Sequence, residues 1–265
     1  MKTFFLFGYH QAMSCIFPVV IFGALALSQV VDIPFMSRYD FILLVCVLAQ
    51  VLMLVCKLET FDEFKVICLF HVIGLGLELY KVHMGSWAYP EEAYSKFLGV
   101  PLYSGFMYAS VASYICQAWR RLNLRIVHWP KAVFAVLLCV LIYGNFFTHH
   151  YLWDARWLLK LMLVLVFLRT VVFFTVNKKT LKMPMVLAFF LIGFFIWIAE
   201  NIVTFYGAWT YPNQEEVWSI VHIGKISSWF LLCVISVIIV AQLKRVKDGS
   251  VVGKKLGNQQ IKKSS

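Results

Sequence analysis

The sequence is short of charge. Only 14% of its 265 residues are Asp, Glu, Lys or Arg, whereas 62% are hydrophobic, and a soluble domain carries about 25% charged residues. Apolar runs recur along the whole chain, many of them close to the roughly 20 residues that take an α-helix across a bilayer. The composition therefore predicts an all-α polytopic membrane protein with a single integral membrane domain over 1–265, and it excludes a sizeable soluble domain.

The sequence also lacks the usual signatures of catalytic chemistry. None of the seven cysteines forms a C-x-x-C pair, which argues against disulfide staples and a zinc–thiolate site. No phosphate-binding glycine loop, G-x-S-x-G or H-E-x-x-H motif occurs, and the histidines show no metal-ligand spacing. We therefore predict no cofactor and no metal.

Acidic residues are scarce relative to basic ones, and the net charge is +11. Such an excess is typical of nucleic-acid binding, but here the basic residues mark the connections between apolar segments, so we predict a lipid bilayer and no nucleic acid as partner. Eight apolar segments are expected. They are about 13–31, 40–57, 64–83, 101–119, 130–147, 157–176, 184–206 and 217–241.

Orientation follows from these connections. Most of the 24 lysines and arginines lie on one side of the eight segments, and the positive-inside rule then places both termini in the cytoplasm of a multi-pass cell-membrane protein. The first run could also imitate a signal peptide, but the single lysine ahead of it and the interrupting Pro18 favour a retained span. The basic tail 242–265 is expected to be cytoplasmic and disordered, either solvated or touching anionic headgroups.

A motif occurs once in each half of the chain. "ELYKVHMGSWAYPEE" begins at Glu78 and "ENIVTFYGAWTYPNQEE" begins at Glu200. Gly, Trp, Tyr and Pro follow each glutamate at the same offsets, and an acidic pair comes next. We interpret about 1–125 and 126–241 as parallel four-helix repeats related by an axis along the membrane normal. The matched positions are Gly85, Trp87, Tyr89 and Pro90 in the first copy and Gly207, Trp209, Tyr211 and Pro212 in the second.

Most of the motif has a structural interpretation. The glycine is expected to end its helix, because it tolerates positive φ, and the tryptophan and tyrosine suit the membrane interface. The proline and the acidic pair are expected to start the next helix. That helix is a short surface helix from Pro90 to Phe97 in the first copy, whereas Pro212 leads straight into the last span in the second.

The two glutamates need a further explanation. Each lies about 10 Å inside its helix end at 1.5 Å per residue, and an intramembrane acid is a functional hypothesis by default. They are either catalytic or structural clamps that accept hydrogen bonds from the loop above. Lys225 is a natural counter-charge, and His222 lies three residues before it, on the same helix face. The polar residues expected to support the site are His71, Asn201, His222 and Lys225.

The string "SWAYPEEAYSKFLGVPLYSGFMYASVASYICQAWR" resembles a bacterial family catalogued as domain of unknown function 817. The resemblance implies a multi-pass membrane protein and carries no catalytic residue with it. A second, weaker resemblance rests on Glu78, Gly85, Trp87 and Tyr89 with the later "LGVPL", an order similar to membrane carotenoid hydratases and small lycopene cyclases. The cyclases follow their proline with paired acids, whereas Pro101 here is followed by "LYSGF".

Three functions fit the sequence. One is binding or acid-catalysed processing of a lipophilic molecule, isoprenoid- or lipid-like, at an outward-side acidic site. Another is a proton- or cation-coupled permease for a small solute, and the third is a membrane scaffold without chemistry. A cavity shared by both glutamates would favour the first, and a polar route between the two membrane faces would favour the second. The sequence makes no prediction of oligomeric state.

Overall fold

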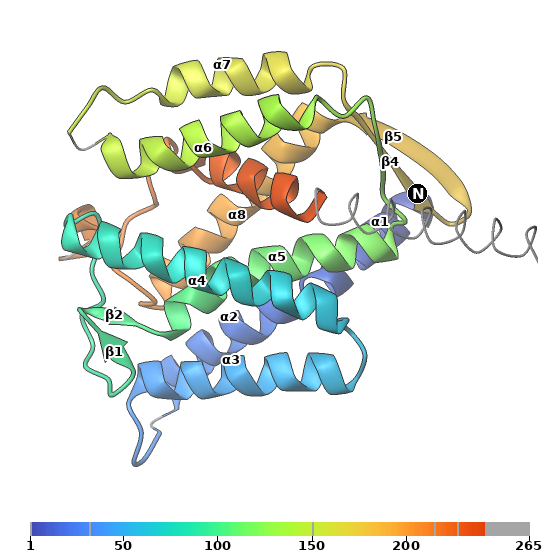
Figure 1. Ribbon diagram of the computed structural model, residues 1–265. Helices are drawn as coiled ribbons and strands as arrows, with labels where there is room; N and C mark the ends of the chain where they lie inside the picture. Colours follow the sequence, from blue (N-terminus) through green and yellow to red (C-terminus); the bar gives the residue numbers. More distant parts are fainter. Residues whose placement is uncertain (1, 32, 150, 215, 227, 242–265) are drawn as a thin grey trace, which may run out of the picture.

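The computed structural model describes residues 2–31, 33–149, 151–214, 216–226 and 228–241, and it is mostly helical (Figure 1). The basic tail 242–265 lies outside the described residues. The helices are α1 (Lys2–Ser14), α2 (Ile16–Val30), α3 (Arg38–Val55), α4 (Phe61–His83), α5 (Tyr103–Arg121), α6 (Ala132–Thr148), α7 (Arg156–Phe167), α8 (Met185–Phe205) and a last helix, Ser228–Ala241. The strands are β1 (Lys96–Phe97), β2 (Val100–Pro101), β3 (Arg125–Val127), β4 (Val171–Val176) and β5 (Lys179–Pro184).

Each predicted apolar segment contains one helix, and these helices run between the same two ends of the molecule in alternating directions (Figure 1). In the described part of the chain, α3, α4 and α8 are each long and apolar enough to cross a membrane. The pair α1 and α2, bent by 64° at Cys15, makes a fourth candidate. The structure therefore has three to four helices that qualify as membrane spans by length and composition.

The region 157–176 is not the continuous helix that the sequence predicts. Helix α7 ends at Phe167, and β4 pairs antiparallel with β3 on one side and β5 on the other. Asn177 and Lys178 have φ values of 50° and 62°, the positive angles of a two-residue hairpin turn whose twist matches that of the strands. The prediction was wrong because an unbroken apolar run does not distinguish a buried helix from a strand.

In the predicted last span, 217–241, the continuous helix begins at Ser228 and ends at Ala241. Pro212 starts a short 3-10 turn, Pro212–Gln214, and residues 216–224 form neither helix nor strand. The carbonyl of Val221 accepts from Trp197 Nε1 at 3.1 Å, and its N–H donates to Asn201 Oδ1 at 2.9 Å. These bonds to α8 satisfy the Val221 backbone without a helix.

The surface helix expected from Pro90 to Phe97 is also absent. Asp40 instead accepts the backbone N–H groups of Tyr94 at 3.0 Å and Ser95 at 2.8 Å. The chain then turns through Leu98 and Gly99, whose φ values are 48° and 80°. The carboxylate thus binds the N–H groups in an irregular segment, and a β1–β2 hairpin follows it.

Close packing of α4 on α5 positions the site. A Cβ placed on Gly74 would lie 2.4 Å from the Tyr108 ring, and one on Gly105 would lie 2.7 Å from the His71 ring. Only glycine fits at these two points, as at many close helix contacts in membranes. The contact carries Tyr108 of α5 to the level of Glu78, one turn beyond Gly74 on α4.

Candidate functional site

Both motif copies end their helix in the same way. Gly85 and Gly207 have φ values of 67° and 65°, which confirms the prediction that each glycine adopts the left-handed conformation. Beyond them, the N–H of Ser86 donates to the Lys81 carbonyl at 2.9 Å, and the N–H of Ala208 donates to the Val203 carbonyl at 3.0 Å. This is the Schellman arrangement, and it turns both loops back over their helix ends.

The two motif loops meet each other. Ala88 and Thr210 form an antiparallel β-bridge, with N–H···O distances of 3.0 and 2.9 Å. Each is the tenth residue after its glutamate. The Trp87 and Tyr211 rings also make an edge contact, with centroids 6.0 Å apart. Equivalent positions of the two copies therefore lie side by side.

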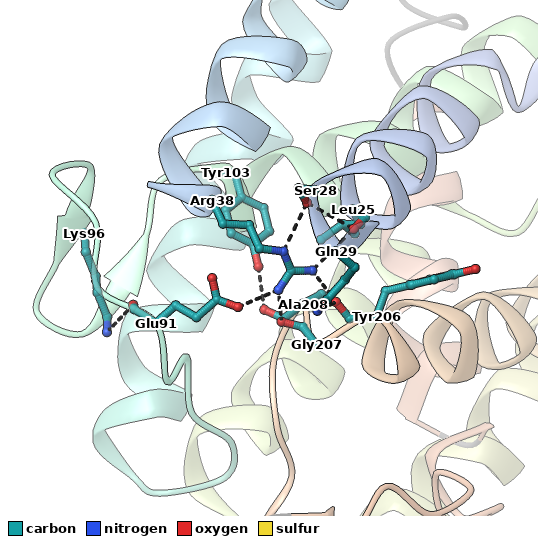
Figure 2. Close-up of polar contacts among 10 residues, drawn as sticks. All are labelled: Leu25, Ser28, Gln29, Arg38, Glu91, Lys96, Tyr103, Tyr206, Gly207 and Ala208. Atoms are coloured by element: carbon teal, nitrogen blue, oxygen red, sulfur yellow. Dashed lines mark hydrogen bonds and ion pairs between the residues drawn. The ribbon is translucent and has the colours of Figure 1, made fainter. Parts of the chain in front are cut away.

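Arg38 joins both loops to α2 and α3, as Figure 2 shows. Its guanidinium donates to Glu91 in the first loop at 2.5 Å and to the Gly207 and Tyr206 carbonyls in the second. It also donates to Ser28 Oγ at 3.0 Å. The acidic pair of the first copy therefore serves this ion pair through Glu91, and not the start of a helix.

Glu78 lies inside the protein. It is 5% exposed and accepts three hydrogen bonds, from Trp87 Nε1 at 2.7 Å, Tyr89 OH at 2.8 Å and Tyr108 OH at 2.7 Å. The first two donors belong to the motif loop, and the third comes from α5. The expectation that the carboxylate points inward and bonds to the loop above it is confirmed at this position.

Glu200 is held in a related way. It is 2% exposed and accepts hydrogen bonds from Tyr211 OH and Trp229 Nε1. Tyr211 is the counterpart of Tyr89, whereas Trp229 comes from the last helix. The motif tyrosines are thus buried, and their hydroxyls bind the carboxylates. Burial, together with the neighbouring carboxylate, raises the pKa of Tyr89 and of Tyr211 well above the usual value.

Both glutamates line one cavity of about 410 Å³. Its walls come from α4, α5, α6, α8, the last helix, both motif loops and the region around the start of α7. Aromatic rings from both copies face it. The other lining side chains used below are Leu77, Lys81, Met107, His149, Arg156, Lys225, Ser228 and Leu232.

The cations of this cavity have different surroundings. Lys225 Nζ lies 4.2 Å from the centroid of the Tyr211 ring and 5.4 Å from that of Trp87. Arg156 is paired with Asp154 at 2.6 Å and donates to Ser228 Oγ at 3.3 Å. Burial opposes the ionised form of Asp154, but the hydrogen bonds from Arg156 outweigh it and lower the pKa of that carboxyl.

His149 lies beside Lys81, with 3.5 Å between Lys81 Nζ and the histidine ring nitrogens. Burial lowers the pKa of His149, and the charge of Lys81 lowers it further. The imidazole is therefore neutral at pH 7 and can accept a hydrogen bond from the ammonium.

The structure brings some of the predicted supporting residues to the cavity and not others. Lys225 and His222 line it, but His222 lies in the irregular segment, so the shared helix face was a wrong prediction. Asn201 is turned away from the cavity toward the Trp197 and Val221 backbone. His71 packs on Phe106, and its Nδ1 is buried without a hydrogen-bond partner among the described residues.

Several cavity residues escaped the sequence interpretation. Lys81 had a usable signal, because it is three residues after Glu78 and so shares its helix face. Tyr108 and Trp229 had none, because they follow the two glutamates at unequal offsets of 30 and 29 residues. His149 and Arg156 had none, because only the tertiary fold brings α6 and α7 to this place.

Fold and site together define a mostly helical protein, with three to four helices long and apolar enough to cross a membrane and an aromatic-lined cavity that holds buried carboxylates. The family model described as "Protein of unknown function (DUF817)" matches residues 3–237, and the chain belongs to this family. It is 60% identical over 244 residues to the uncharacterized protein YoaT of Bacillus subtilis (strain 168), covering 92% of each chain. Among solved structures it is similar to a cross-linked MvINS trimer, with a TM-score of 0.45 and 13% identity over 68% of this chain and 92% of that one.

Proposed function

We propose that the protein binds a lipophilic small molecule, isoprenoid- or lipid-like, in the cavity at the outward side of the membrane. The observation that carries this proposal is the cavity itself, into which both motif copies direct their aromatic side chains. Its volume of about 410 Å³ falls within the range of roughly 300–1,000 Å³ typical of small-molecule sites. The second resemblance, to carotenoid hydratases, implies a ligand of the same class.

The surroundings of the glutamates favour binding over acid-catalysed processing. Glu78 accepts from three donors and Glu200 from two, so the carboxylate oxygens are engaged with the protein. A general acid needs a proton aimed at the substrate, whereas the oxygens of these groups accept hydrogen bonds from Trp N–H and Tyr O–H groups. We therefore assign both the role of clamps that shape the cavity wall.

A permease is the second candidate, because the cavity wall carries charged side chains. Against it, the pocket behind Tyr108 and Trp229 holds only about 10 Å³ and is lined mainly by apolar residues such as Val111 and Ile196. That volume is at the lower limit for a single water molecule. The polar part of the cavity therefore does not continue along this direction.

For the membrane arrangement we propose eight spans, both termini in the cytoplasm, and two parallel halves. The alternating directions of the eight helical segments support the span count (Figure 1), and the Ala88–Thr210 bridge between equivalent positions supports the repeat. Helix α7 and the last helix have 12 and 14 residues, about 18 and 21 Å at 1.5 Å per residue. Each covers part of a hydrocarbon core of about 30 Å.

Equilibrium binding of tritiated decanol tests the proposed function. The purified protein in nanodiscs is expected to bind it saturably above the level of empty nanodiscs. Met107→Trp, which fills the cavity from α5, should abolish the saturable part. Leu137→Trp makes a similar enlargement on α6, where the side chain is 49% exposed, and should leave binding unchanged. Equal binding by both variants, or no saturable binding by the wild type, contradicts the proposal.

A further inference from the structure

The cationic residues of the cavity gather at its loop end. Lys81 is in the last turn of α4, Arg156 is the first residue of α7, and Lys225 lies just ahead of the last helix. All three line the same cavity. A neutral lipophilic ligand would not require any of them, and charges of the same sign in one wall repel one another.

Lys225 is the clearest sign of a missing partner. Its ammonium lies over the Tyr211 and Trp87 rings, and no hydrogen bond or ion pair joins it to another side chain in the described part of the chain. Glu78 and Glu200 attract this ammonium electrostatically, but the side chains that donate hydrogen bonds to them are Trp and Tyr and not Lys225. A half-buried ammonium held over two rings still has N–H groups that can donate to an anionic ligand.

The apolar part of the cavity lies deeper. Leu232 lies one turn inside the last helix, beyond Lys225 in the chain, and on α4 Leu77 lies one turn deeper than Lys81. Met107 from α5 adds to this wall. The cavity therefore has a cationic end near the loops and an apolar end toward the membrane centre.

We propose that the ligand is an amphipathic anion whose carboxylate or phosphate group contacts Lys225 and Lys81 while its apolar body lies against Leu77, Met107 and Leu232. This rests on the proposed function and specifies its ligand class. A cationic ligand head is disfavoured, because it would meet the three positive charges at the loop end of the cavity. Arg156 is partly neutralised by Asp154 and positions the wall through Ser228.

The test compares tritiated decanoate with tritiated decanol on the full-length protein in nanodiscs. They share a chain and differ in the head, so wild-type protein should bind decanoate about tenfold or more tightly, the effect of one or two hydrogen bonds to a charged group. Lys225→Gln should remove that preference and leave decanol binding unchanged. Lys225→Arg should keep it. Lys182→Gln, the same charge change on the exposed strand β5, should have no effect.

Competition separates the sources of the anion. Decyl phosphate should displace decanoate from the wild type, whereas acetate and inorganic phosphate, which lack the apolar body, should compete at least about tenfold less well. Equal competition by inorganic phosphate would show a simple anion site and overturn the amphipathic class. Equal binding of decanoate and decanol would overturn the cationic subsite, and saturable decanol binding that Met107→Trp abolishes would still uphold the proposed function.

Discussion

Glu78 and Glu200 show how a buried carboxylate is kept inside an apolar helix pair. A charge in hydrocarbon costs several kcal/mol unless it is compensated, and here Trp and Tyr donors compensate it. Tyr89 and Tyr211 are buried with their acceptor, and the other donors are partly buried, so removing the carboxylate leaves polar groups stranded. At such a site the loss comes from the orphaned donors more than from the bond itself.

Glutamine and leucine substitutions should therefore differ. In Glu78→Gln the amide oxygen can accept from Trp87 and Tyr89 while the NH2 group donates to Tyr108 OH, so the free energy of unfolding should change little. Glu78→Leu strands three donors at about 1–3 kcal/mol each, and Glu200→Leu strands two. We expect the order Gln, Glu200→Leu, Glu78→Leu in increasing destabilisation, measured by thermal unfolding in detergent.

Decanol binding by the same glutamate variants is a second measurement beside their thermal unfolding. Clamps predict that both glutamine variants fold and bind as the wild type does. If the glutamine variants fold but no longer turn over a lipophilic substrate, the carboxyl protons take part in the reaction. That result would contradict the assignment of the glutamates as clamps.

The sequence could locate these residues but not all their partners. Burial of Glu78 follows from its depth in an apolar run, and Tyr89 and Tyr211 follow from the repeated offsets. The tryptophan nine residues after each glutamate does not follow the repeat. Trp87 donates to Glu78, whereas the tryptophan that donates to Glu200 is Trp229 and not Trp209. No local pattern encodes the substitution, since Trp229 arrives from another helix.

At the scale of elements, glycines fix where helices stop and how closely they pack. Sequence patterns identified the helix ends at Gly85 and Gly207, because a left-handed residue has a strong compositional preference. They did not identify the β4–β5 hairpin, where Val171 to Val176 has the same hydrophobicity as a membrane helix. The expected Pro90 helix failed for a different reason: the competing acceptor, Asp40, is 50 residues earlier in the chain.

The two helix-ending glycines should respond unequally to alanine. Left-handed backbone costs a residue with a Cβ about 1–2 kcal/mol, which applies to both. At Gly85 nothing lies within 4 Å of the added Cβ, whereas at Gly207 it would lie 3.0 Å from Gln29 Nε2 and 3.3 Å from Arg38. Gly207→Ala should therefore destabilise the protein more than Gly85→Ala in thermal unfolding, and equal losses would mean that the Arg38 contacts adjust freely.

The α4–α5 contact offers a matched pair on one helix. Gly74→Ala places a Cβ 2.4 Å from the Tyr108 ring, while Gly76→Ala places one in open space. Overpacking typically costs about 1–3 kcal/mol, so Gly74→Ala should lower stability and weaken decanol binding by displacing Tyr108 from Glu78. Gly76→Ala should be neutral or slightly stabilising. Similar behaviour of the two variants would show that the contact is not tight.

On the scale of the whole molecule, four basic residues near the motif loops each bind the loops or line the cavity. Arg38 binds both motif loops, Lys96 donates to the Tyr89 and Glu91 carbonyls at 2.8 and 3.0 Å, and Lys81 and Arg156 line the cavity. Because these four serve the fold or the site, the remaining basic residues carry the topology signal. This strengthens the charge asymmetry on which the proposed orientation rests.

Reporter fusions test that orientation. Fusions after Arg125 and Lys182 should report the cytoplasm, and fusions near Lys96 and Gln214 should report the outside. The motif loops meet at Ala88 and Thr210, so Lys96 and Gln214 must give the same answer. A cytoplasmic signal at Gln214 would overturn both the span count and the parallel arrangement of the halves.

The pairing of each glutamate within its own half bears on how the chain is made. All three donors to Glu78 precede residue 109, and both donors to Glu200 lie in the second half. During synthesis, Glu78 can thus be neutralised by its own partners as soon as α5 emerges, before any of the second half exists. The carboxylate of α4 therefore does not remain without hydrogen-bond donors until the second half of the chain has been synthesised. Only the cavity, which needs walls from both halves, has to wait for the end of translation.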